Sequence, residues 1–192
     1  MIARSLLLAY VFALSTSTWS QVIWNEDVHG DLSGDRFNPT SLNLGWGSNV
    51  VIGSMGEGDR EYVHFHLAPG MELSQLRVLA YVSTDPLAFI GVQEGTIFTE
   101  PHEGANPGNL LGYTLWGPQD IGVDILPRMG QAPSTIGFTP PLTGSDYTFW
   151  IQQTGDPTDY SLDFVTVPEP ATISLGIGVA AILLRRRARQ TR

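Results

Sequence analysis

The stretch GSDYTFWIQQTGDPTDYSLDF, residues 144–164, predicts two β-strands that each bury one face. Large apolar and aromatic side chains occupy alternate positions on both sides of a turn that contains glycine and proline. Side chains two positions apart lie on the same face of a strand. The side chains that share a face are Tyr147, Phe149 and Ile151 in the first strand and Tyr160, Leu162 and Phe164 in the second. We expect the two strands to form a hairpin that closes a β-sheet core.

Outward from this stretch, short runs of β-branched and aromatic residues recur, and turn-forming residues separate them about every 8 to 12 positions. This spacing predicts an all-β domain with the fold of an antiparallel β-sandwich, jelly-roll-like in outline. The expected strands are 49–54, 61–67, 75–82, 87–92, 96–99, 111–116, 146–153 and 160–167. In the second of them Val63, Phe65 and Leu67 share a face, which we assign to the core.

Glycine and proline also mark the connections between the expected strands. The step Glu94-Gly95 separates two strands and therefore predicts a tight hairpin. Residues 100–110 and 118–142 are rich in glycine and proline, which predicts long surface loops. No segment before Ala171 shows a helical period, so we expect no helix in this region.

The composition restricts the classes of site that this chain can form. It contains no cysteine, so disulfides, thiolate metal sites and cysteine nucleophiles are excluded. Residues 21–167 contain eighteen acidic side chains and four arginines, which leaves a net charge of −14, and they contain no lysine. Such a surface repels nucleic acid and anionic lipid. We therefore expect an acidic exported domain with no nucleic-acid partner, or alternatively an acidic face that binds cations.

Residues 1–20 have the layout of a secretory signal peptide. Arg4 provides one positive charge, the run LLLAYVFAL at residues 6–14 is apolar, and STSTWS at residues 15–20 ends the segment with small polar residues. We expect this signal peptide to be removed, so that the mature chain starts near Gln21.

Residues 167–192, VPEPATISLGIGVAAILLRRRARQTR, combine a proline-rich motif, an apolar run and a cluster of arginines. As a helix, the apolar run at residues 171–184 would reach about 21 Å, against about 30 Å of hydrocarbon. Arginine side chains can extend such a helix by reaching the interface, and their cluster indicates the cytoplasmic side. The cluster consists of Arg185, Arg186, Arg187, Arg189 and Arg192. We expect a short transmembrane helix with the acidic domain outside the membrane.

The order of these three parts closely resembles the PEP-CTERM sorting signal of Gram-negative bacteria. The resemblance covers about Val167 to Arg189. The residues of the sorting motif itself are Val167, Pro168, Glu169 and Pro170. Because proline disfavours helix in the residue before it, we expect this motif to be extended and exposed, as a protease substrate must be.

The resemblance implies that an exosortase, which is a membrane-embedded protease, recognises the motif, cuts close to it and releases or transfers the protein. The chain would then comprise a signal peptide (1–20), an extracytoplasmic domain (21–167) and a sorting signal (168–192). It would cross the inner membrane, stay anchored there transiently, and end at the cell surface or outside the cell. The family also implies a link to exopolysaccharide and biofilm.

The central region is similar, with less specific motifs, to the bacterial pre-peptidase C-terminal domain and related jelly-roll modules of exported proteins. The similarity rests on GDREYVHFHLAPG at residues 58–70, an acidic turn that leads into a strand, and on the stretch 144–164. It would cover about Gly30 to Val167, although residues 118–142 do not align. It implies the same β-sandwich fold.

The central region shows no recognisable enzyme site. There is no Gly-x-Ser-x-Gly motif, and the serines lie in turn-rich sequence, so we predict that the protein is not an enzyme. His64 and His66 stand two apart on one strand and could reach one metal ion, but His29 and His102 fall in loops. We therefore interpret the pair as solvated strand residues. The alternative to a non-enzymatic protein is a secreted hydrolase that uses a pair of carboxylates to cut envelope polysaccharide.

Calcium binding and glycan binding are two further alternatives for the domain. Acidic residues gather at turns, which could supply the oxygen ligands of a calcium ion, but the full order of a calcium-binding loop is missing. We therefore assign no cofactor, and the calcium candidates are Asp31, Asp35, Asp156 and Asp159. Trp150 should lie with Thr148 and Gln152 on the strand face opposite the core. There its indole could stack on a sugar ring or pack under a loop.

Overall fold

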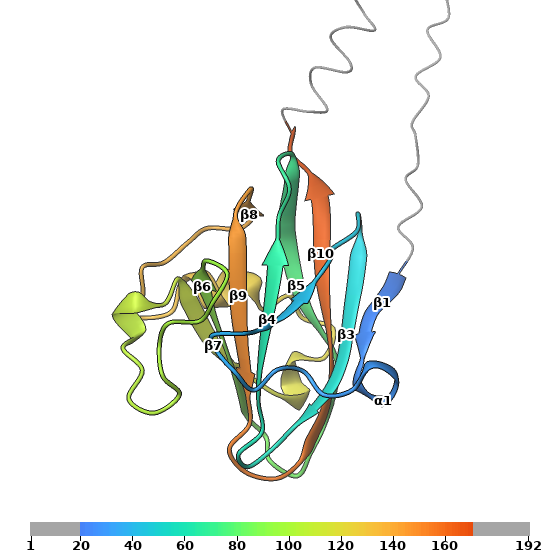
Figure 1. Cartoon of the computed structure of the whole chain (residues 1–192), viewed down its shortest axis with the longest axis vertical. Coiled ribbons are helices and arrows are strands. Elements are labelled where there is room, and N and C mark those ends of the chain that lie inside the picture. Colours follow the sequence, from blue (N-terminus) through green and yellow to red (C-terminus); the bar gives the residue numbers. More distant parts are fainter. Residues whose placement is uncertain (1–19, 171–192) are drawn as a thin grey trace, which may run out of the picture.

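The computed structural model describes residues 20–170, in which ten strands form two five-stranded sheets (Figure 1). The first sheet contains, in spatial order, β1 (Ser20–Asn25), β3 (Ser48–Met55), β10 (Thr158–Pro168), β5 (Met71–Val82) and β8 (Leu142–Thr143). The second contains β2 (Thr40–Leu42), β4 (Arg60–His66), β9 (Asp146–Gln152), β6 (Ala88–Glu94) and β7 (Gly112–Trp116). The all-β sandwich expected from the sequence is confirmed.

From β3 to β10 the chain passes repeatedly between the two sheets, and the paired strands in this part are antiparallel. Each sheet thus combines strands from both halves of the domain, which is the arrangement of a jelly roll. The two outermost strands depart from the antiparallel expectation, because β1 pairs with β3 and β2 pairs with β4 in parallel. In each pair a long stretch of chain separates the two strands, as parallel pairing requires.

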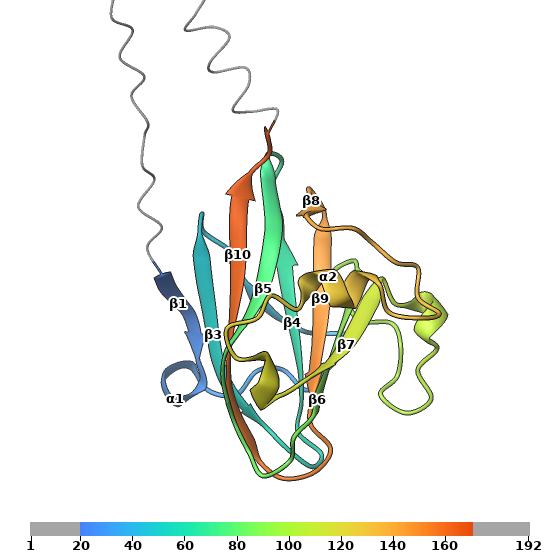
Figure 2. The ribbon, with the colours of Figure 1, turned by 180° about the vertical axis from the view of Figure 1, so that it is seen from behind.

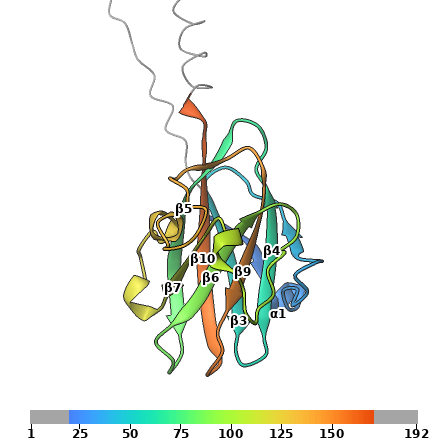
Figure 3. The ribbon, with the colours of Figure 1, turned by 90° about the vertical axis from the view of Figure 1, so that its left-hand side faces the viewer.

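The core lies between the two sheets, which pack face to face (Figure 3). The nine core residues expected from alternation are all buried, with at most 7% of each side chain exposed. The Phe65 ring contacts the rings of Phe149 and Phe164, at centroid distances of 5.8 and 4.6 Å. Because Phe164 belongs to one sheet and the other two rings to the second, these aromatic side chains join the layers. Burying each one contributes roughly 1.5–3 kcal/mol.

Both predicted hairpins are wrong. β9 and β10 lie in different sheets, where β9 pairs with β4 and β6 and β10 pairs with β3 and β5. Their apolar faces bury each other across the sandwich, so the turn between them crosses from one sheet to the other. Residues 96–99 form no strand, because both edges of β6 are already paired, with β7 and with β9.

The connection between β7 and β8 is more than a surface loop. It contains the 3-10 helix η2 (Pro118–Asp120) and the short helix α2 (Leu126–Gly130), which packs against β5 and β7 (Figure 2). Its side chains Ile125, Leu126 and Met129 are fully buried. The Ile125 N–H donates to the Leu76 carbonyl at 2.8 Å, so this segment covers the edge of β5 that β8 leaves open.

The remaining helices are one-turn elements, α1 (Glu26–His29) and η1 (Pro107–Asn109). Elements of three to five residues are too short to produce a helical period, so the sequence pattern did not reveal them. Within residues 20–170 no helix has the length and apolar character needed to cross a membrane. The predicted signal peptide, the predicted helix at 171–184 and the arginine cluster lie outside the described residues, apart from Ser20.

The two ends of the described chain lie at the same end of the sandwich (Figure 1). Ser20, the first residue of β1, accepts a hydrogen bond from the Ser48 hydroxyl at 3.1 Å. The neighbouring residue Gly47 pairs with Thr166 near the end of β10. The start of the domain is therefore separated from the end of β10 by a single strand, β3.

Candidate functional site

The sorting motif begins inside the fold, in the last residues of β10. Val167 pairs with Glu72, and Pro168 pairs with Met71 at the start of β5. Beyond the strand, the Glu169 N–H donates to the Gly70 carbonyl at 2.9 Å. The sorting motif is thus attached to the turn between β4 and β5 without an intervening linker.

This turn has the geometry that its Ala-Pro-Gly sequence favours. The Met71 N–H donates to the Ala68 carbonyl at 2.9 Å, and Gly70 adopts a φ of +87°, a conformation that glycine accepts readily. Pro168 and Pro170 are exposed, whereas Val167 and Glu169 are half-buried, so the exposure expected for the whole motif is wrong at these two residues. The two prolines are therefore the parts of the motif that a partner can reach most directly.

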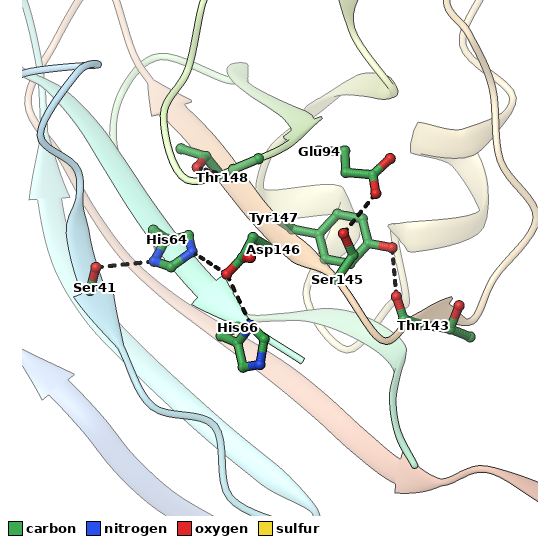
Figure 4. Close-up of polar contacts among 10 residues, drawn as sticks. Ser41, His64, His66, Glu94, Thr143, Ser145, Asp146, Tyr147 and Thr148 are labelled. Carbon is green, nitrogen blue, oxygen red and sulfur yellow. Dashed lines mark hydrogen bonds and ion pairs between the residues drawn. The ribbon is translucent and has the colours of Figure 1, made fainter. Parts of the chain in front are cut away.

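His64 and His66 meet a carboxylate in a cluster that spans three strands (Figure 4). His64 Nε2 and His66 Nδ1 each lie 3.0 Å from the same Oδ1 oxygen of Asp146, and His64 Nδ1 lies 3.0 Å from the Ser41 hydroxyl. Ser41, His64, His66 and Asp146 form what we call the histidine cluster. Its members come from β2, β4 and β9, which are neighbours in the second sheet.

The hydrogen-bonding chemistry of the histidine cluster follows from the carboxylate. An ionised carboxylate only accepts, so the nitrogens of His64 and His66 that face Asp146 must carry hydrogens. These two hydrogen bonds hold the pKa of Asp146 below its usual value. When His64 is neutral, its other nitrogen accepts from the Ser41 hydroxyl.

Ser41, His64 and Asp146 follow the order of groups in a hydrolase triad. A triad also requires donors for an oxyanion beside the nucleophile, usually at a turn or a helix N-terminus. Ser41 instead is the middle residue of the paired strand β2, on the exposed surface of the sheet. The arrangement therefore fits a set of hydrogen bonds that links neighbouring strands better than it fits a catalytic triad.

Trp150 lies on the outer face of the second sheet, as expected, but it is not free to stack on a sugar. Only 4% of its side chain is exposed, because the connection between β6 and β7 folds over it. Phe98 and Leu110 from that connection pack against Trp150 and Tyr62. The structure thus corrects the glycan candidate and shows the alternative, packing under a loop.

The four aspartates expected as calcium candidates do not converge. Asp35 accepts from the Phe37 N–H at 2.9 Å within its own turn, and Asp156 accepts from the Thr84 hydroxyl. Asp159 lines a cavity beside β3, which Glu26 also lines. Asp31 alone joins other carboxylates, because one oxygen each from Asp31, Glu26 and Glu61 lie within 4.8 Å of one another. We call these three residues the acidic cluster.

The acidic cluster combines a surface loop with the interior of the sandwich. Glu26, in α1, accepts from the Leu32 N–H at 3.1 Å and from the Ser54 N–H at 2.6 Å. Glu61, in β4, is completely buried and accepts from the Tyr160 hydroxyl. Sequence reasoning missed Glu26 and Glu61 because one lies in an unrecognised helix and the other occupies a core position of its strand.

Burial raises the pKa of both glutamates. For Glu61 the pKa is well above its usual value, first because the carboxyl group is desolvated and then because Glu26, Asp59 and Asp31 add negative charge nearby. The Tyr160 hydroxyl acts in the opposite direction by donating to Glu61. Desolvation also raises the pKa of Glu26, although the hydrogen bonds from Leu32 and Ser54 oppose it.

Comparison with known proteins identifies one segment of the chain. No curated protein and no solved structure matches the chain. The similarity of the central region to the pre-peptidase C-terminal domain therefore stays a prediction. Residues 166–187 match the family model of the PEP-CTERM protein-sorting motif. The matched residues include the end of β10 and the residues that follow it. The chain thus carries a PEP-CTERM sorting motif, the mark of an exported protein that an exosortase sorts.

Proposed function

We propose that the protein is an exported, non-enzymatic jelly-roll protein whose final location is set by exosortase processing at Pro168-Glu169-Pro170. The observation that carries this proposal is the match of residues 166–187 to the sorting motif. Residues 171–184 would hold the protein in the inner membrane until it is cut. The product would then reach the cell surface or the extracellular matrix of a Gram-negative bacterium, in association with exopolysaccharide.

The position of the sorting motif supports processing of a folded domain. Strand β10 is already complete at Pro168, and one backbone hydrogen bond joins Glu169 to the turn at Gly70. Releasing that bond would detach Glu169 from the turn for a protease while the paired part of β10 stays in place. The domain can therefore fold before it is cut and keep its fold afterwards.

The candidate residues favour a non-enzymatic role. The histidine cluster links strands on an exposed sheet face, and Trp150 is covered by the connection between β6 and β7. Neither group of residues offers a nucleophile beside an oxyanion site. Association with exopolysaccharide therefore rests on the sorting motif alone.

The test is maturation of the full chain in a host with and without its exosortase. Glu169→Ala should block processing, because the carboxylate contributes to recognition while the backbone bond to Gly70 is kept. Glu103→Ala is a matched control, since its carboxylate is 90% exposed and lies in the connection between β6 and β7. The size of the protein on a gel and its cell fraction report the result.

Replacing Arg185, Arg186 and Arg187 together by Ser should give a different defect. Loss of the positive flank would impair retention of the tail in the cytoplasm, so the protein would mis-insert or be lost to the periplasm. The proposal fails if Glu169→Ala matures like the wild type, or if maturation persists without the exosortase. In either case the tail would act only as an anchor.

A further inference from the structure

We propose that the acidic cluster of Glu26, Asp31 and Glu61 is a binding site for a calcium ion. One carboxylate oxygen from each residue lies within 4.8 Å of the other two. Oxygens that surround one calcium ion at about 2.3–2.6 Å can be separated by up to about this distance. The three side chains come from α1, from the loop after it and from β4, so the site forms only when the domain folds.

An independent observation that points to a ligand is the unpaired oxygen of Glu61. The Glu61 side chain has 0% of its surface exposed, and its Oε2 accepts from the Tyr160 hydroxyl, while its Oε1 has no hydrogen-bond partner within residues 20–170. A buried polar atom without a partner is costly, and a buried charge without one is more so. A bound cation would supply the missing partner.

Among the described residues, no cationic side chain offsets the charge of the cluster. Glu26, Asp59 and Asp31 surround Glu61 with further negative charge. Among residues 20–170, the ion pairs involve Asp146, Glu103 and Asp120 and include no member of the acidic cluster. A divalent cation would neutralise most of the charge of three carboxylates.

The donor set indicates a hard cation. It consists of carboxylate oxygens, which calcium and magnesium prefer and which zinc seldom uses alone. Calcium tolerates irregular geometry and takes six to eight oxygens, so bidentate carboxylates and water would complete the shell. Gly53 leaves room at this point, because a Cβ there would lie 2.8 Å from the Tyr160 hydroxyl oxygen and 3.1 Å from the carboxyl carbon of Glu26.

A calcium ion at this position would connect elements from both sheets. Glu61 belongs to β4 of the second sheet, whereas Glu26 is hydrogen-bonded to Ser54 in β3 of the first. Asp31 would bring the loop after α1 into the same contact. The ion would thus hold the N-terminal segment of the domain against the sandwich, and the domain would gain stability wherever calcium is plentiful.

The test uses the full chain in detergent micelles after removal of metal by EDTA. Titration with calcium chloride, followed by calorimetry, should release heat with a stoichiometry of about one. Calcium at about one hundred times the Kd should raise Tm by about 5–10 °C. Magnesium should have a smaller effect, because it demands a stricter octahedral geometry than this cluster offers.

Two variants and one control locate the effect. Glu61→Gln should abolish the calcium response, and Asp31→Asn should weaken binding at least tenfold. Because Asp31 is exposed, its variant keeps the test valid even if Glu61→Gln does not fold. Glu57→Gln is the matched control, an exposed glutamate in the neighbouring turn that lies outside the acidic cluster, and it should bind calcium like the wild type.

The proposal is overturned if the wild type shows neither heat nor a rise in Tm with calcium. It is also overturned if Asp31→Asn responds like the wild type. If Glu57→Gln loses as much affinity as Asp31→Asn, calcium is attracted by the overall negative charge and the acidic cluster is not the site.

Discussion

The acidic cluster and the histidine cluster both use strand β4, on opposite faces of the same sheet. Glu61 shares the inner face with Val63 and Phe65, whereas His64 and His66 lie on the outer face. On the inner face, desolvation and negative neighbours raise the pKa of Glu61. On the outer face, two imidazoles lower the pKa of Asp146.

The contrast shows that the local surroundings of a carboxylate decide whether it needs a further partner such as a cation. The net negative charge of the chain does not decide this. Asp146 is partly solvated and has two imidazole neighbours, so its charge is already compensated. Among residues 20–170, Glu61 has one hydroxyl donor, and its second oxygen has no hydrogen-bond partner. The outer cluster is complete in itself, and the inner cluster is not.

Tyr160→Phe should have the largest effect among the variants that test this contrast. It removes the hydroxyl that donates to Glu61, so both carboxylate oxygens would lack a protein partner. We expect a loss of about 1–3 kcal/mol in the free energy of unfolding without calcium, measured by urea denaturation. Tyr147→Phe is the control, because that hydroxyl donates to the Thr143 carbonyl at 2.8 Å and its removal should cost about 0.5–1.5 kcal/mol. A smaller loss for Tyr160→Phe than for Tyr147→Phe would refute the contrast.

Asp146→Asn should have a smaller effect that depends on pH. The pKa of Asp146 is lowered in the folded protein, so its contribution is fully present above the pKa of the unfolded chain. That contribution is lost as the pH falls through the folded pKa. We expect a loss of at most about 1 kcal/mol at pH 7, because the pair is partly exposed, and a shrinking difference from the wild type in acid. A difference that fails to shrink as the pH falls through the folded pKa of Asp146 would show that the two imidazoles do not stabilise the charged form.

Ser41→Ala should have the smallest effect. The Ser41 hydroxyl is exposed and lies at the end of the hydrogen-bonded chain, so water can replace it beside His64. We expect a change within about 0.5 kcal/mol in the free energy of unfolding. Any ester hydrolysis by the wild-type protein that Ser41→Ala abolishes would instead show that the histidine cluster acts as a catalytic triad.

The alternation of apolar residues predicted the core because it depends only on neighbours along the chain. Phe149 and Phe164 each follow a period of two, and both are buried. Strand partners depend on contacts far apart in sequence, so β9 and β10 appeared to form a hairpin although they lie in opposite sheets. The same limit applies to the connection between β7 and β8. Its sequence predicted a surface loop, but its residues Leu126 and Met129 are buried.

The candidate sites were predictable in the same uneven way. The sorting motif is continuous, so its residues could be read directly from the sequence. The acidic cluster joins Glu26 and Asp31 to Glu61, which is about thirty residues away in the sequence. Glu61 also occupies an inward-facing strand position that normally holds an apolar side chain. His64 and His66 were interpreted as solvated strand residues, but both contact Asp146 and the His64 side chain is only 13% exposed. Their partners Ser41 and Asp146 lie in other strands, which the sequence does not reveal.

The central place of β10 in the first sheet has a mechanical consequence. A force applied to the chain beyond Pro168 enters the domain along a strand that is paired on one side with β3 and on the other with β5. Such a pull loads many backbone hydrogen bonds at once, in shear, whereas a pull across an edge strand would break them one after another. The domain should therefore resist tension most strongly along the direction of β10 itself.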